Sequence, residues 1–326
     1  MAQNTSSFYK IENKFMVPGE GGWDYLSVDE ATGRVFLSHG TVVNVVDEKD
    51  GKLLGTITDT KGVHGIAVAN DLNKAFISNG RDSSVTIVDL KTLAFITKTS
   101  VTGQNPDAIL YDPFSHKVFA FNGRTSDATV IDGFTNKVVA TIKLDGKPEF
   151  SVTDGKGKVY VNIEDKSEIS CINSKTLKVE QTWSIAPGEE PSGLAIDNDN
   201  HRLFAVCGNK LMVVVNSESG KVITTLPIGD RVDGAAFDPG LKRAYSSNGE
   251  GTMTVVQEIS PTEFKVLENV STQPGARTIT VNKKNHKIYL TTAEFGPVPE
   301  KTTDNPRPRP AIKPGTFTLI VVAPVK

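Results

Sequence analysis

The chain consists of short segments in which apolar and polar residues alternate, separated by turns rich in Gly, Asn, Asp and Pro. An alternation of period two, carried by Val, Ile, Thr and aromatic residues, predicts β-strands. No segment shows the sustained three-to-four-residue spacing of apolar residues that marks an amphipathic helix. The pattern therefore predicts an all-β protein.

These segments belong to a longer repeat of about 42 residues. Each copy contains an apolar strand, a turn with a basic residue, a strand with an aromatic residue, a Val- or Ile-rich strand and a fourth strand. The seven copies begin at Trp23, Val63, Pro106, Pro148, Pro191, Val232 and Ala276. Four-stranded units of this length, repeated seven times, predict a seven-bladed β-propeller with antiparallel blades.

The last copy has only three strands of its own, whereas a further strand-like segment, Tyr9 to Val17, precedes the first copy. We expect this N-terminal strand to complete blade seven and close the ring, so that residues 1–326 form a single domain. A Pro-rich insertion, residues 295–315, separates the second and third strands of blade seven. An insertion of this length is expected to be a lid over the axial mouth, a partner-binding segment or a flexible loop.

The turn sequences support a resemblance to a known family. Two examples of these turns are Asp-Leu-Lys-Thr from Asp89 and Asn-Ser-Lys-Thr from Asn173. Together with the repeat length, they resemble the YVTN β-propeller family, specifically its YncE-like group. The Pro-rich insertion is similar to one in the last blade of many YncE-like proteins. The resemblance covers nearly the whole chain and implies a propeller with a periplasmic or extracellular location. It implies no particular activity, because function resides in sites rather than in folds.

Composition excludes several classes of function. With 36 Lys and Arg against 38 Asp and Glu, the net charge is −2, which lacks the positive field that nucleic-acid binding uses. Apolar runs are too short for a transmembrane segment, and two cysteines cannot form a disulfide scaffold. The first residues show no signal peptide, so we expect either a cytoplasmic protein or, as the resemblance implies, an exported one. We also expect a monomer.

Propeller topology places the start of each first strand and the end of each second strand on one face of the ring. The second residue of the seven first strands is Asp24, His64, Asp107, Glu149, Ser192, Asp233 or Arg277. Four carboxylates converging on one axis, offset by Arg277 and His64, would form a negative well that binds a ligand or a divalent cation. Alternatively, these acids only cap strand ends by accepting hydrogen bonds from backbone amides.

The ends of the second strands supply further candidates on this face. Asn79, Asn122 and Asn248 each precede Gly, which is an ordinary turn signal because both residues tolerate positive φ, but their amides are also candidate ligand-binding groups. His39 and Cys207 replace Asn in two blades and, with His64, form a candidate zinc or copper set. The remaining histidines, His116, His201 and His286, are expected in solvated turns on the opposite face, at positions held elsewhere by Gly33 or Lys242.

Known catalytic motifs are absent, including the nucleophile elbow, the zincin helix and the phosphate-binding loops. The segment Asp-Asn-Asp-Asn-His from Asp197 resembles a calcium loop only weakly, because it lacks the Gly and the final Glu. The sequence favours a noncatalytic propeller that binds a small molecule, a metal ion or a protein partner at the axial mouth. The alternative is a metal-dependent enzyme of lactonase or lyase type, with an ion on Asp107, Glu149 or Asp233 and with His64 as the proton-transfer group.

Overall fold

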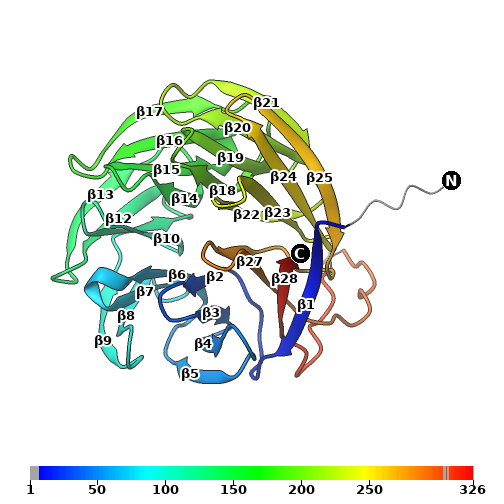
Figure 1. Cartoon of the computed structure of the whole chain (residues 1–326). Coiled ribbons are helices and arrows are strands. Elements are labelled where there is room, and N and C mark those ends of the chain that lie inside the picture. The colour runs from blue at the N-terminus through cyan, green and yellow to red at the C-terminus, as the bar shows by residue number, and fades with distance from the viewer. Residues whose placement is uncertain (1–6, 304–305, 307, 326) are drawn as a thin grey trace.

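A computed structural model describes residues 7–303, 306 and 308–325. Seven four-stranded antiparallel sheets form a ring around a central axis (Figure 1), which confirms the predicted fold class. Within the described residues, helix is limited to two single turns, η1 (Asn70–Leu72) and η2 (Glu164–Lys166). No helix among them is long and apolar enough to cross a membrane.

The first four blades use consecutive strands in the order in which they follow in the chain. Blade one comprises β2 (Leu26–Asp29), β3 (Arg34–His39), β4 (Val42–Asp47) and β5 (Leu53–Ile57). Blade two comprises β6 (Val63–Ala69), β7 (Lys74–Asn79), β8 (Ser84–Asp89) and β9 (Phe95–Ser100). Blade three comprises β10 (Pro106–Asp112), β11 (Lys117–Asn122), β12 (Asp127–Asp132) and β13 (Val138–Lys143). Blade four comprises β14 (Pro148–Thr153), β15 (Lys158–Ile163), β16 (Glu168–Asn173) and β17 (Lys178–Ser184).

The last three blades follow the same plan until the ring closes. Blade five comprises β18 (Pro191–Asp197), β19 (Arg202–Cys207), β20 (Leu211–Asn216) and β21 (Val222–Pro227). Blade six comprises β22 (Val232–Asp238), β23 (Arg243–Asn248), β24 (Thr252–Ser260) and β25 (Glu263–Ser271). Blade seven comprises β26 (Ile279–Asn282), β27 (Lys287–Thr292), β28 (Thr318–Pro324) and the N-terminal strand β1 (Tyr9–Met16).

The first strand of every blade lies innermost, where neighbouring first strands contact one another around the axis. Five of the seven predicted repeat starts coincide with the first residue of an inner strand, whereas β2 and β26 begin three residues later than predicted. In blade one the amide of Asp24, before the strand begins, donates to the hydroxyl of Ser38 (2.8 Å).

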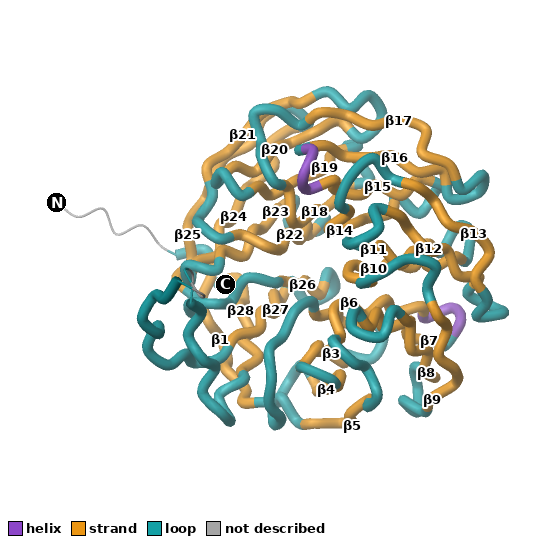
Figure 2. Tube along the Cα trace, turned by 180° about the vertical axis from the view of Figure 1, so that it is seen from behind, coloured by secondary structure: helices purple, strands orange, loops and turns teal. Residues whose placement is uncertain are grey.

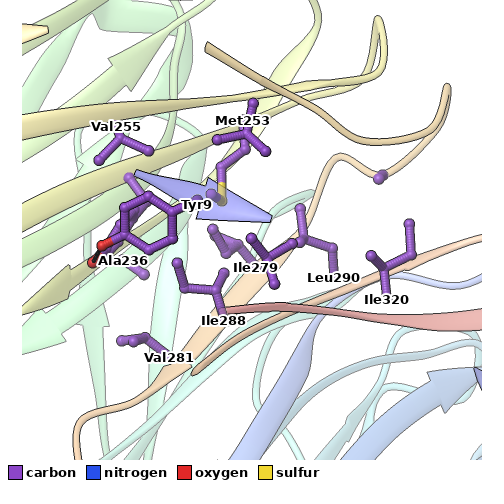
Figure 3. Close-up of a cluster of buried hydrophobic side chains, with 13 residues drawn as sticks. Tyr9, Ala236, Met253, Val255, Ile279, Val281, Ile288, Leu290 and Ile320 are labelled. Atoms are coloured by element: carbon purple, nitrogen blue, oxygen red, sulfur yellow. Dashed lines mark hydrogen bonds between the residues drawn. The ribbon is translucent and has the colours of Figure 1, made fainter. Parts of the chain in front are cut away.

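The N-terminal strand closes the ring as predicted. Its register with β28 runs antiparallel from Tyr9 opposite Pro324 to Met16 opposite Thr318. Tyr9 is buried in a cluster shared by blades six and seven (Figure 3). Its hydroxyl lies 2.8 Å from that of Tyr245 and also accepts a 2.8 Å hydrogen bond from Arg243. One buried side chain therefore fastens the start of the chain to two blades.

The hydrophobic core is divided among the interfaces between blades. The described residues form seven buried clusters, and each combines side chains from two neighbouring blades; the cluster of blades three and four also includes Tyr25 of blade one. Every second strand contributes an aromatic ring that is at most 4% exposed: Phe36, Phe76, Phe119, Tyr160, Phe204, Tyr245 and Tyr289. Burial of these rings provides much of the free energy that holds neighbouring blades together.

The Pro-rich insertion joins β27 to β28 and is fastened at its base. Phe295 pairs with Ile312 in an isolated antiparallel bridge, and the amide of Lys313 donates to the carbonyl of Glu294 (2.8 Å). In Figures 1 and 2 the described part of the insertion lies at the outer side of blade seven, near β1 and β28. The lid over the axis that the sequence suggested as one possibility is therefore not observed.

Candidate functional site

The mouth of the axis is lined by the residues that enter the seven inner strands. Its centre is His64, whose Nδ1 lies 2.6 Å from Asp24 Oδ2. The same nitrogen lies 3.4 Å from Asp107 Oδ1, an oxygen that is shielded from solvent and makes no hydrogen bond. Ligand atoms of Asp24, His64 and Asp107 all lie within 4.8 Å of one another, and no other such group of three occurs among the described residues. These three side chains, called the mouth triad below, could hold a metal ion.

Arg277 continues the network on the other side of Asp24. Its Nη2 lies 3.3 Å from Asp24 Oδ1, and its Nε lies 2.9 Å from Asp233 Oδ2. Because the guanidinium contacts both carboxylates, it holds Asp24 in place with one oxygen facing Arg277 and the other facing His64. The sequence predicted that Asp24, Asp233 and Arg277 converge, and the structure brings them to the same end of the axis.

A second ion-pair group, which the sequence analysis missed, surrounds Glu149. Lys147 Nζ lies 3.0 Å from Glu149 Oε2 and also contacts Glu164. A signal for Glu164 was present in the repeat, because five blades have Gly after the second strand where blade four has this acid.

The mouth holds more negative than positive charge. Burial raises the pKa of Asp107 to about 6, that of Asp233 to about 7 and that of Glu149 to about 8. Neighbouring carboxylates add to each shift. Burial lowers the pKa of His64, but its hydrogen bond to Asp24 and the charge of Asp107 outweigh this effect and raise it. Groups arranged in this way favour a bound cation.

Strand capping does not account for these acids. No hydrogen bond among the described residues joins a backbone amide to the carboxylate of Asp24, Asp107, Glu149 or Asp233. Asp24, Asp107 and Asp233 instead contact side chains of other blades, and Glu149 contacts Lys147, which lies just before its own blade. The acidic residues therefore interact with one another and with the basic groups of the mouth.

A layer of two aromatic rings lies directly below the charged mouth. Tyr25 and Phe150 follow Asp24 and Glu149 in the chain, and their ring centroids lie 5.1 Å apart at an interplanar angle of 58°. They come from blades one and four, which face each other across the axis (Figure 1). At the corresponding position the other five blades have small residues: Gly65, Ala108, Gly193, Gly234 and Thr278. We call this pair the aromatic diaphragm.

Beyond the diaphragm the axis widens into a cavity of about 410 Å³. All seven inner strands line it, mainly with apolar side chains such as Val28, Val68, Ile196 and Val281. Tyr25 is only 7% exposed, and burial together with the charge of Asp107 raises its pKa. The diaphragm thus lies between the charged mouth and this wider cavity.

The predicted Asn residues at the mouth serve the blades themselves. Asn79, Asn122 and Asn248 are fully buried, and each amide donates to side chains of the following third strand. Asn79, for example, donates to the hydroxyl of Thr86 (2.8 Å). The sequence interpretation of a turn with positive φ at Asn-Gly was wrong: the left-handed residues are Ser83, Ser126 and Gly251, which directly precede the third strands.

His39 and Cys207 do not join the mouth triad. His39 is 1% exposed, its Nδ1 lies 3.1 Å from Asn44 Oδ1, and its ring packs 4.1 Å from that of Phe317. Cys207 is fully buried, which raises its pKa to about 12. The three predicted metal ligands His39, His64 and Cys207 are not brought together, because residues that end second strands point into the blades and not toward the axis.

The other three histidines lie where the sequence placed them, in turns on the far face. His116, His201 and His286 have φ of 52°, 57° and 62°, and Gly33 and Lys242 have φ of 71° and 51° at corresponding positions. They are not all simply solvated, since His286 Nδ1 lies 2.7 Å from Asp238 Oδ2. None of them reaches the mouth.

Comparisons with known proteins identify the fold and nothing finer. No protein-family profile matches the chain, and neither does any curated protein. Among solved structures, 1746 chains match. One of them belongs to a structure entitled "Kuenenia stuttgartiensis Hydrazine Synthase"; it is 16% identical, has a TM-score of 0.74, and the match covers 84% of this chain and 94% of that chain. At this identity the likeness shows the fold alone, so the chain is a seven-bladed β-propeller whose resemblance to the YVTN family is unconfirmed.

Proposed function

We propose that this propeller is a binding protein whose axial mouth holds one divalent transition-metal ion on Asp24, His64 and Asp107. The observation that carries the proposal is the convergence of one imidazole nitrogen and two carboxylate oxygens within 4.8 Å. An imidazole together with carboxylates suits zinc, copper or nickel better than calcium. The buried Asp107 oxygen without a hydrogen bond is a natural ligand for such an ion.

Neighbouring residues would tune this site. Arg277 fixes the orientation of Asp24, as groups hydrogen-bonded to metal ligands generally do. Because the three ligands come from three blades and face the open mouth, coordination positions remain for a small molecule or for a side chain of a protein partner. The aromatic diaphragm forms the floor of that space.

Thermal unfolding of chelator-treated protein tests the proposal. Zinc or copper at increasing concentration should raise the melting temperature by linkage, and elemental analysis should find one ion per chain. Asp107→Asn and His64→Gln should each lose this effect. His201→Gln, an exposed histidine on the far face, should keep it. A metal response that persists in Asp107→Asn, or its absence in the wild type, would overturn the assignment.

A second function, a metal-dependent lactonase- or lyase-like enzyme, is favoured by one specific observation. His64 is oriented by Asp24 at 2.6 Å while its side chain stays 26% exposed, which is the arrangement of a general base. A bound ion would supply Lewis acidity at the same mouth. Hydrolysis of simple lactones by the zinc-loaded protein, lost in His64→Gln, would establish this function. If no lactone is hydrolysed although zinc binds, the binding function stands alone.

We further infer from the repeat length, the turn sequences and the Pro-rich insertion that the chain is a YVTN-type, YncE-like propeller exported to the periplasm or cell surface. It would act there as a monomer that presents its mouth face to a ligand or protein partner. Fractionation of the producing cells and light scattering of the purified protein test location and oligomeric state separately.

A further inference from the structure

A buried acidic pair lies between blades five and six, on the face opposite the mouth. Glu258, near the end of β24, is 3% exposed, and neither of its carboxylate oxygens has a hydrogen-bond partner or contact with solvent. Asp197, the last residue of β18, is also 3% exposed and lies within hydrogen-bonding reach of Glu258. Asp197 accepts hydrogen bonds from the backbone amide of Asp199 (3.0 Å) and from Asn200 Nδ2 (2.9 Å), whereas Glu258 has no donor. A buried carboxylate without donors, close to a second acid, is strongly unfavourable unless something else compensates it.

The same position in another blade shows what compensation looks like. Glu48 occupies the equivalent place in blade one and reaches into blade seven. It accepts hydrogen bonds from Tyr289 Oη (2.8 Å), Asn282 Nδ2 (2.8 Å) and Asn285 Nδ2 (3.2 Å). The acid at the junction of blades seven and one is therefore fully satisfied by neutral donors.

Blade five lacks those donors. The residues equivalent to Asn282 and Tyr289 are Asp197 and Phe204. A carboxylate therefore replaces the amide of Asn282, and the ring of Phe204 lacks the hydroxyl of Tyr289. Asn200, equivalent to Asn285, donates to Asp197 (2.9 Å) instead of to the glutamate. The junction of blades five and six therefore keeps the glutamate found between blades seven and one, but it has a second acid in place of the donors.

We propose that Glu258 and Asp197 form a calcium site between blades five and six, independent of the mouth triad. Both side chains offer only oxygen, the ligand that calcium prefers, and the absence of His and Cys disfavours zinc or copper. Backbone carbonyls and water would complete the coordination. The Asp-Asn-Asp-Asn-His segment from Asp197, which resembles a calcium loop only weakly by itself, supplies one half of this site and β24 the other half.

The basic groups nearby do not replace the ion. Arg202 is 7% exposed, but its Nε donates to the carbonyl of Pro261 (2.7 Å) and its Nη1 to that of His201 (2.9 Å). Neither the Arg202 nor the Lys242 side chain forms a hydrogen bond with Glu258, and both act on it only through their charge. Burial, and next the contact with Asp197, raise the pKa of Glu258 to about 8.

Isothermal titration of chelator-treated protein with calcium chloride at pH 7 tests the site. Wild type should bind one ion per chain. Calcium should also raise the melting temperature. Asp197→Asn recreates the amide present at the other junction, so it should lose calcium binding while being at least as stable as the calcium-free wild type. Glu258→Gln should lose calcium binding as well.

Two control variants separate this site from other effects. Glu48→Gln alters the counterpart acid and should keep the full calcium response, and so should Asp107→Asn, which alters only the mouth. If the wild type shows neither binding heat nor a melting shift with calcium, the proposal is wrong. The same conclusion follows if Asp197→Asn and Glu258→Gln respond to calcium as the wild type does.

Discussion

Among single residues, the acids of the axial mouth are strongly influenced by their surroundings. Glu149 is half of an ion pair with Lys147, yet burial and the nearby Asp107 charge still raise its pKa from 4.5 to about 8. An acid with a raised pKa binds its proton more tightly in the folded than in the unfolded state. Its contribution to stability is therefore present at low pH and is lost as the pH rises toward 8.

From this we predict that the metal-free protein is less stable at pH 8 than at pH 5. Glu149→Gln should remove part of that loss and stabilise the protein at pH 8 by on the order of 1 kcal/mol. Urea unfolding of both proteins across this pH range measures the difference. The exposed Glu20→Gln variant serves as control and should follow the wild type, and parallel pH profiles for Glu149→Gln and wild type would contradict the prediction.

At the scale of elements, the strands are joined by polar side chains as well as by backbone ladders. The buried amides of Asn79, Asn122 and Asn248 connect the end of each second strand to the third strand of the same blade. This explains why Asn recurs there without the turn conformation that its Asn-Gly sequence suggests. A repeated residue can mark a repeated internal contact as well as a turn.

Strand β1 is the element on which ring closure depends, and we predict that deletion of residues 1–17 destabilises the whole domain. The deletion exposes the edge of β28 and removes the buried ring of Tyr9. Loss of one large buried aromatic side chain alone costs about 3 kcal/mol or more. The midpoint of urea unfolding, followed by circular dichroism, should fall accordingly. Met16→Ser on the same strand, where the side chain is 70% exposed, should have little effect. An unchanged midpoint after the deletion would refute this role of β1.

For the whole molecule, the seven interface clusters form a closed cycle in which every blade has two neighbours. Open repeat arrays can unfold from their ends, but a ring has no end blade. We therefore predict a single calorimetric unfolding transition. Phe204→Ala, which weakens the contact between blades five and six, should lower its temperature without splitting it. Two resolved transitions in the wild type would show that the ring contains separable parts.

The repeat made most of this architecture predictable, because local alternation and turn residues recur at a fixed interval. Asp24, His64 and Arg277 could be assigned to one mouth because symmetry places equivalent positions at one level. The repeat did not predict the side-chain contacts between blades. Whether His39 points to the axis or into its blade depends on strand twist, and the opposition of Asp197 to Glu258 depends on how neighbouring blades pack. Tyr25 and Phe150 are large residues at a position of small ones, a signal that the sequence analysis did not use, and their contact requires the ring to be closed.

The aromatic diaphragm has a consequence for the rate at which ligands exchange. Because Tyr25 and Phe150 close the floor of the mouth, a molecule bound there can leave only through the opening by which it entered. A partner protein seated on that face would cover the single exit. Ligand release would then become no faster than dissociation of the partner, so the complex would retain its ligand for the lifetime of the assembly whatever the affinity of the mouth itself.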